Sequence, residues 1–239
     1  MKKLKILLAC ALSAVFACGM VALAGCGDDD EGKISDSEWS EYLNLDCESY
    51  DTFTMIVKQY SNYGKEEAKE YGKWYSYTDT IKIDNKNSVI TRHATEQSYN
   101  SDANNGTGGF VTKYYETYNL LYGDKYYEWN HGGYEELMIL ERTKADFTQK
   151  LELYSLQITA LQAYANLKSK FKYNSSTAMY EMEYLGVKVC IQFHLDGGLR
   201  ILQQNNTLTT TEILVTGLNA TEVSVPYFVY EDIDEFKAN

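Results

Sequence analysis

The chain has 239 residues, with 34 acidic and 22 basic side chains and a formal net charge of −12. This acidic balance disfavours nucleic acid and anionic membrane surfaces as electrostatic partners. The sequence contains 22 tyrosines, 8 phenylalanines and 3 tryptophans but one proline, a composition that favours half-buried β-sheet.

The first segment in the chain is basic and then apolar. Three lysines lie within the first five residues, and an apolar run extends from Ile6 to Ala24. A run of about 20 apolar residues is long enough for a membrane span. The order of basic, apolar and small residues is instead typical of a secretory signal peptide. We therefore expect residues 1–25 to be a signal peptide, and the alternative is an uncleaved anchor helix.

The apolar run ends in Leu23-Ala24-Gly25-Cys26, which resembles the lipobox of bacterial lipoproteins. In that family a diacylglyceryl group is attached to the cysteine sulfur, and a signal peptidase cuts just before the cysteine. The resemblance implies cleavage between Gly25 and Cys26, lipidation of Cys26 and a protein anchored on the extracytoplasmic face of the cell membrane. Two acyl chains anchor a protein much more firmly than one.

A short acidic stretch follows the lipobox. Residues 28–31 are Asp-Asp-Asp-Glu between two glycines, and they lack the alternating spacing of a calcium-binding loop. Such a charged segment buries too little apolar area to fold, so we expect residues 26–35 to be a flexible tether. No further linker is evident, and residues 36–239 are predicted to form a single domain.

Two further cysteines, Cys47 and Cys190, lie after the tether. Outside the cytoplasm they either pair in a disulfide or lie apart as buried apolar residues. The sequence has no CxxC motif, and we expect neither a metal site nor a cofactor.

The first element of the domain is a predicted short helix over residues 36–48. Trp39, Leu43 and Cys47 recur at helical spacing, and Ser35 or Ser37 is the expected N-cap. From residue 50 the apolar period becomes two, which predicts antiparallel strands. These strands are expected over 52–60, 73–83, 88–97, 110–122 and 125–129, with a long polar loop at 99–109 and a two-residue hairpin turn at 123–124.

A long helix is predicted over residues 144–171. Thr143 and Asp146 resemble a capping box, with Asp in place of the preferred Glu, and Phe147, Leu151 and Tyr154 follow at helical spacing. Alternation then predicts a second set of strands over 172–185, 187–195, 199–204, 211–218 and 221–228, followed by a frayed acidic tail over 231–239.

This order of elements predicts an α+β fold. We expect a single curved antiparallel sheet packed on the long helix, together with the short N-terminal helix. The layout of residues 36–239 and the lipid anchor resemble the half-barrel lipoproteins typified by the LolA and LppX families. In those families an open, curved sheet holds an acyl chain or lipid under its helices. No motif specific to either family is present, so the resemblance implies no binding residue.

Few residues suggest catalytic chemistry. His93, His131 and His194 show no metal-binding or catalytic spacing, and we expect turn or sheet-face residues. Glu116 and Glu128 lie among tyrosines, where they are either a glycosidase-type pair or, as we favour, exposed strand acids.

The tyrosine-rich strands suggest a candidate ligand site. Tyr75, Tyr77, Tyr114 and Tyr118 are expected either to line an apolar cavity with polar tips or simply to fill the core of the sheet. The sequence therefore predicts a non-enzymatic lipoprotein that binds a lipid or other apolar ligand between sheet and helix. The alternative is a structural or interaction lipoprotein that presents an aromatic, acidic surface to a protein or glycan partner.

Overall fold

The computed structural model describes residues 33–46, 49–62, 64, 74–100, 108–133, 135–184, 186–194, 197–205 and 209–238. The expected signal peptide, Cys26, most of the tether and Cys47 lie outside these ranges. Within them, no helix combines the length and the apolar character that crossing a membrane requires.

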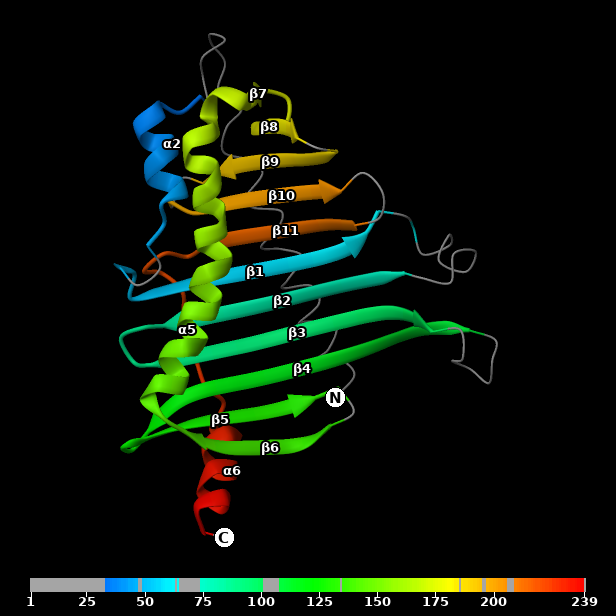
Figure 1. Ribbon diagram of the computed structural model, residues 1–239. Coiled ribbons are helices and arrows are strands. Elements are labelled where there is room, and N and C mark those ends of the chain that lie inside the picture. The colour runs from blue at the N-terminus through cyan, green and yellow to red at the C-terminus, as the bar shows by residue number, and fades with distance from the viewer. Residues whose placement is uncertain are drawn as a thin grey trace.

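The described strands form one open antiparallel sheet (Figure 1). Its strands are β1 (Thr52–Ser61), β2 (Tyr75–Asp84), β3 (Val89–Asn100), β4 (Gly109–Tyr122), β5 (Lys125–Gly132), β6 (Glu135–Arg142), β7 (Lys172–Asn174), β8 (Met179–Tyr184), β9 (Val187–Phe193), β10 (Leu199–Asn205) and β11 (Thr209–Thr216). The order across this 11-stranded sheet is β6-β5-β4-β3-β2-β1-β11-β10-β9-β8-β7. The predicted α+β class and antiparallel sheet are confirmed.

The two halves of the sheet join where β1 pairs with β11. The register runs from Thr54 opposite Thr216 to Ser61 opposite Thr209. Each half is a meander of strands that are neighbours in the chain, whereas this central pairing joins strands that are far apart in the sequence. The predicted strand 172–185 is divided into β7 and β8 by a turn, in which the Asn174 side chain accepts a hydrogen bond from the Ser176 N–H at 3.1 Å.

Four helices accompany the sheet in the described ranges: α2 (Asp36–Leu43), α5 (Lys144–Thr159), the 3₁₀ helix η2 (Ala160–Lys170) and α6 (Tyr227–Ala238). Figure 1 shows α2 and α5 in front of one face, with α5 crossing several strands. The α6 helix lies behind the opposite face near β5 and β6. The predicted helix 36–48 is shorter than expected, and the predicted helix 144–171 changes to 3₁₀ geometry after residue 159.

Of the two serines expected as N-cap of the first helix, Ser35 takes that role and also forms a capping box, and the predicted capping box at Thr143 and Asp146 is confirmed. The Ser35 hydroxyl accepts the Glu38 N–H at 3.2 Å, and the Glu38 carboxylate accepts the Ser35 N–H at 2.7 Å. The Asp146 N–H donates to the Thr143 hydroxyl at 3.2 Å, and the Thr143 N–H donates to the Asp146 carboxylate at 2.8 Å. Aspartate therefore takes the role that glutamate usually has in this motif.

The main core lies between the sheet and the helices α2, α5 and η2. Trp39 of α2 is fully buried, and its ring centroid lies 5.0 Å from Phe171, 5.1 Å from Tyr180 and 5.4 Å from Phe193. Its indole N–H donates to the Tyr164 carbonyl at 3.1 Å. These contacts fix α2 over the β7–β9 side of the sheet.

The C-terminal segment differs from the prediction. In place of a strand over 221–228 and a frayed tail, residues 221–226 are irregular and α6 begins at Tyr227. Val229 and Ile233, one helical turn apart, are fully buried against Tyr118 and Trp129. Pro226 has no N–H for a strand ladder, and its carbonyl accepts the Val229 N–H at 3.1 Å. The alternating residues before the proline therefore do not continue into a strand.

Truncation of Ile233 tests how α6 is held. We expect Ile233→Ala to lower the free energy of unfolding by about 2 kcal/mol, because a buried isoleucine loses most of its contacts. The same change should shift tryptophan emission to the red, since Trp129 packs in this cluster. Chemical denaturation followed by fluorescence measures both effects, with Glu231→Ala on the exposed side of α6 as the control. Equal stability of the two variants would contradict the placement of α6.

Candidate functional site

The three arginines of the sequence each form an ion pair with a buried carboxylate within the sheet. In each pair the arginine Nε donates to a buried carboxylate on the neighbouring strand. The arginine is always two residues from the position directly opposite the acid. The pairs are Arg92–Asp79 at 2.8 Å, Arg142–Glu128 at 2.9 Å and Arg200–Glu212 at 2.6 Å.

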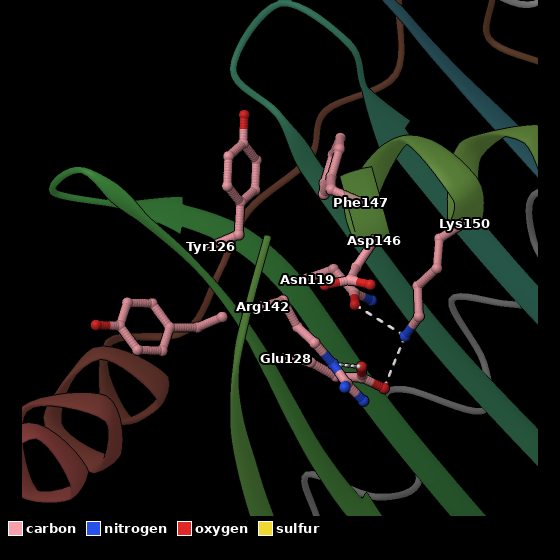
Figure 2. Close-up of a pocket in the computed structure, with 8 residues that line it drawn as sticks. Asn119, Tyr126, Glu128, Arg142, Asp146, Phe147 and Lys150 are labelled. Carbon is pink, nitrogen blue, oxygen red and sulfur yellow. Dashed lines mark hydrogen bonds and ion pairs between the residues drawn. The ribbon is translucent and has the colours of Figure 1, made fainter. Parts of the chain in front are cut away.

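Glu128 of β5 lies at the centre of a polar cluster beneath α5 (Figure 2). Its carboxylate accepts from Arg142, from Lys150 Nζ at 2.7 Å and from Asn130 Nδ2 at 2.9 Å. Lys150, which comes from α5, also donates to Asn119 Oδ1 at 2.9 Å. Burial alone would raise the pKa of the Glu128 carboxyl, but the hydrogen bonds from Lys150, Asn130 and Arg142 outweigh it and hold the pKa below its usual value.

The space around this cluster is small. The cavity between α5 and the strands measures about 10 Å³ and is lined by Asn119, Glu128, Phe147 and Lys150 among others (Figure 2). That volume accommodates about one water molecule. Within the part of the chain that the structure describes, the Asn119 Nδ2 is buried and has no hydrogen-bond partner. At this point the interface between helix and sheet therefore has room for a water molecule and not for an acyl chain.

A second cluster lies on the same face of the sheet. The Asp79 carboxylate accepts from Arg92 and, at 2.8 Å, from the Tyr77 hydroxyl, and Arg92 Nη2 donates to the same Tyr77 oxygen. Burial and the neighbouring Asp79 raise the pKa of Tyr77 to about 12. Burial alone would lower the pKa of Arg92, but Asp79 raises it above its usual value. The guanidinium of Arg92 is therefore charged and held in one orientation.

A cleft of about 180 Å³ opens beside Arg92. The residues that line it are Arg92, Tyr115, Glu116, Thr117, Asn130, His131, Gly132, Glu136 and Met138. The cleft coincides with a β-bulge, because between the pairs Asn130–Met138 and Gly132–Glu135 two steps along β5 face three along β6.

Gly132 allows the strands to approach at this bulge. Its φ is +139°, and a Cβ at this position would come within 2.1 Å of the Tyr114 carbonyl oxygen. A side chain is therefore excluded by the neighbouring backbone as well as by the conformation. Gly132 thus fixes the wall of the cleft.

The four tyrosines of the predicted ligand site do not line one cavity. Tyr75 and Tyr77 stack with ring centroids 6.4 Å apart on the face that α5 covers. Tyr118 is buried on the opposite face, 5.4 Å from the Trp129 ring, and burial raises its pKa to about 12. Tyr114, four residues before Tyr118 on the same strand, shares that face and is 65% exposed. Tyr118 therefore fits the core-filling alternative, whereas Tyr114 is a surface residue.

The two glutamates of the glycosidase hypothesis project from opposite faces. Glu128 lies beneath α5, whereas Glu116 shares the face of Tyr118, two residues further along β4. They cannot flank one glycosidic bond. The expectation of exposed strand acids holds for Glu116, whose side chain is 43% exposed, and is wrong for Glu128, which is buried.

The sheet register brings two of the three histidines next to one acid. His93 of β3 and His131 of β5 both lie directly opposite Glu116, and His93 Nδ1 is 3.7 Å from the Glu116 carboxylate. His194 follows the end of β9. The spacing of residues along the sequence does not predict this alignment of His93, Glu116 and His131, because it arises only from strand pairing. In the described ranges no group of three His, Cys, Asp or Glu residues is placed to hold a metal ion.

Cys190 is a buried free thiol whose pKa is raised by burial. Its candidate disulfide partner, Cys47, lies outside the described residues. Comparisons with known proteins add no relative, since no family model, curated protein or solved structure matches this chain.

Proposed function

We propose that this chain is a membrane-anchored extracytoplasmic lipoprotein without enzymatic activity that binds a protein or glycan partner. In this proposal residues 1–25 are the signal peptide, Cys26 carries the diacylglyceryl anchor and residues 26–35 are the tether. The four lipobox residues, Leu23 to Cys26, support the anchor. The fractionation of Cys26→Ala that tests it is described in the Discussion.

The observation that favours a protein or glycan partner over a lipid is the polar cluster around Glu128 beneath α5. A lipid carrier needs an unfilled, mostly apolar cavity. The contact between α5 and the sheet instead contains Glu128, Lys150 and Asn119, joined by hydrogen bonds around a cavity of about 10 Å³. Placing an acyl chain there would separate charged groups from their partners at a large cost in free energy. This interface favours binding at the surface over carriage of a lipid.

The point where the tether joins the domain lies far from the cleft. The tether reaches α2 beside β8, where the Ile34 N–H donates to the Tyr180 hydroxyl at 2.6 Å. Ten residues span at most about 35 Å when fully extended. From β8 to β5 the sheet order has eight steps, and at about 4.8 Å per step they amount to about 38 Å. The cleft therefore lies about 38 Å along the sheet from the strand beside which the tether joins the domain.

Lipid binding in a half-barrel is the second candidate function. In its favour, α2 and α5 lie over one face of an open antiparallel sheet (Figure 1), the layout expected of the LolA and LppX families. A ligand would then enter between a curved sheet and the long helix, outside the polar clusters. This alternative also requires the anchor on Cys26, so the two candidates differ only in what the domain binds.

Native mass spectrometry distinguishes these candidates. We expect residues 27–239, which retain all the described elements, to give the mass of the protein alone and to take up no phospholipid from added phosphatidylglycerol vesicles. The reason is the filled interface beneath α5. A co-purified lipid mass that is released on unfolding would contradict the proposal and favour the half-barrel carrier. Extraction of the same sample into organic solvent serves as an independent control for tightly bound lipid.

A further inference from the structure

We propose that the cleft beside Arg92 binds one neutral sugar ring. The inference rests on the proposed function, because it takes the glycan as the partner. It adds a location, a ligand class and the residues that make the contacts. The cleft lies between β3 and β6, at the bulge opposite Asn130 and Gly132.

The size of the cleft excludes large ligands. Its volume is about 180 Å³. Pockets for drug-sized ligands start at about 300 Å³. A single sugar ring is of the size that fits, and the remainder of a glycan chain would extend into solvent.

Two hydrogen-bonding groups in the cleft are held in place from behind. The Arg92 Nε and Nη2 are engaged by Asp79 and Tyr77, which leaves the Nη1 donors for a ligand. The Asn130 Nδ2 donates to Glu128, so that its Oδ1 is the atom left to accept. Donors and acceptors fixed by a buried outer layer bind without a large loss of side-chain entropy.

The other walls suit the remaining features of a sugar ring. Thr117 and Glu136 add a hydroxyl and a carboxylate, while Tyr115 and Met138 add apolar surface. The Tyr115 hydroxyl donates to the Glu96 carboxylate at 3.2 Å, which restrains its ring. Closely spaced hydroxyls beside C–H surface require this mixture of polar groups and an amphipathic aromatic ring.

The charge in the cleft disfavours an anionic ligand. Asp79 already pairs with Arg92, and the lining adds the carboxylate of Glu136. Glu116 and His131 also border the cleft, but both project from the opposite face of the sheet, where the Glu116 carboxylate lies near His93. A carboxylate or phosphate ligand would meet Glu136, while the charge of Arg92 is already matched by Asp79.

Saturation-transfer NMR on the full-length protein in detergent tests this assignment. The probes are the methyl β-glycosides of glucose, galactose and N-acetylglucosamine, with glucuronate and glucosamine as charged comparisons. We expect transfer to at least one neutral glycoside and weaker transfer to glucuronate. Glu136→Gln, at an exposed position, should weaken binding about tenfold because it removes a charged acceptor. Glu152→Gln, at an exposed position on α5, is the matched control and should bind normally.

Three results would overturn the assignment: no transfer to any neutral glycoside, stronger transfer to a charged sugar, or equal binding by the Glu136→Gln and Glu152→Gln variants. Thr117→Val, which keeps the side-chain shape and removes the hydroxyl, provides a second test and should also weaken binding. None of these results bears on the anchor at Cys26 or on a protein partner. Failure of the sugar site is therefore distinguishable from failure of the proposed function.

Discussion

Replacement of Glu128 by alanine should lower the free energy of unfolding by about 3 kcal/mol, the lower end of the range for breaking a buried ion pair. Arg142 and Lys150 would then lie beneath α5 without their shared carboxylate. Their side chains are 39% and 30% exposed, so water recovers part of the loss. Urea denaturation followed by circular dichroism measures the change.

Glu116→Ala is the matched control on the neighbouring strand. Its carboxylate is on the opposite face and half exposed, so the free energy of unfolding should change by less than about 0.5 kcal/mol. If Glu128→Ala were as stable as this control, the polar cluster would contribute nothing to stability. A double-mutant cycle with Lys150→Met isolates the pair, because the loss from the second substitution should be smaller once Glu128 is absent.

The same carboxylate predicts a dependence of stability on pH. In the unfolded chain a glutamate titrates near pH ~4.3, and in the folded protein the pKa of Glu128 is lower. Its contribution is therefore complete above about pH 4.3 and is lost as the pH falls through the folded pKa. The difference in unfolding free energy between the wild type and Glu128→Gln should be constant from pH 5 to 7 and should shrink at lower pH.

Local patterns predicted most individual elements correctly. The period of two located β1 and β4 to within one residue, and the hairpin turn at 123–124 follows from Gly-Asp between alternating strands. The join between β1 and β11 was not predictable in the same way. It pairs segments about 150 residues apart, and no local propensity encodes which edges of two meanders meet.

The arginines of these ion pairs are visible in the sequence, but the alternation of apolar and polar residues does not identify their role. The basic residues are mostly lysine, and the three arginines each lie within a strand. Arginine is the preferred partner for buried carboxylates, so its scarcity here marks these positions. The partner acids could not be assigned, because a diagonal contact requires the strand register.

The local sequence does not predict the cleft. Gly132 and Gly133 follow His131, and in the sequence they predict only a turn. In the structure Gly132 ends β5 inside a bulge, where the Tyr114 carbonyl leaves no room for a Cβ. A bulge is decided by how two strands pair, and for this reason neither the cleft nor the position of Glu136 beside it follows from the spacing of residues along the chain.

Substitution of Cys26 should have the largest effect on where the protein resides. In the proposal its sulfur carries two acyl chains, and each buried CH₂ contributes about 0.8 kcal/mol to membrane binding. Cys26→Ala removes the attachment atom and the cleavage signal together. We expect no incorporation of an alkyne-labelled palmitate and accumulation of a precursor that retains residues 1–25. Gel mobility and labelling of membrane fractions measure both effects.

Cys18→Ala is the matched control, because Cys18 lies in the same apolar run but eight residues before the lipobox cysteine. This variant should be labelled and processed like the wild type. Labelling of a mature-sized Cys26→Ala protein in the membrane fraction would contradict the lipobox assignment. Loss of labelling in both variants would instead place the requirement in the apolar run as a whole. The distinction decides whether the domain is tethered to the membrane through Cys26, by a segment that spans at most about 35 Å.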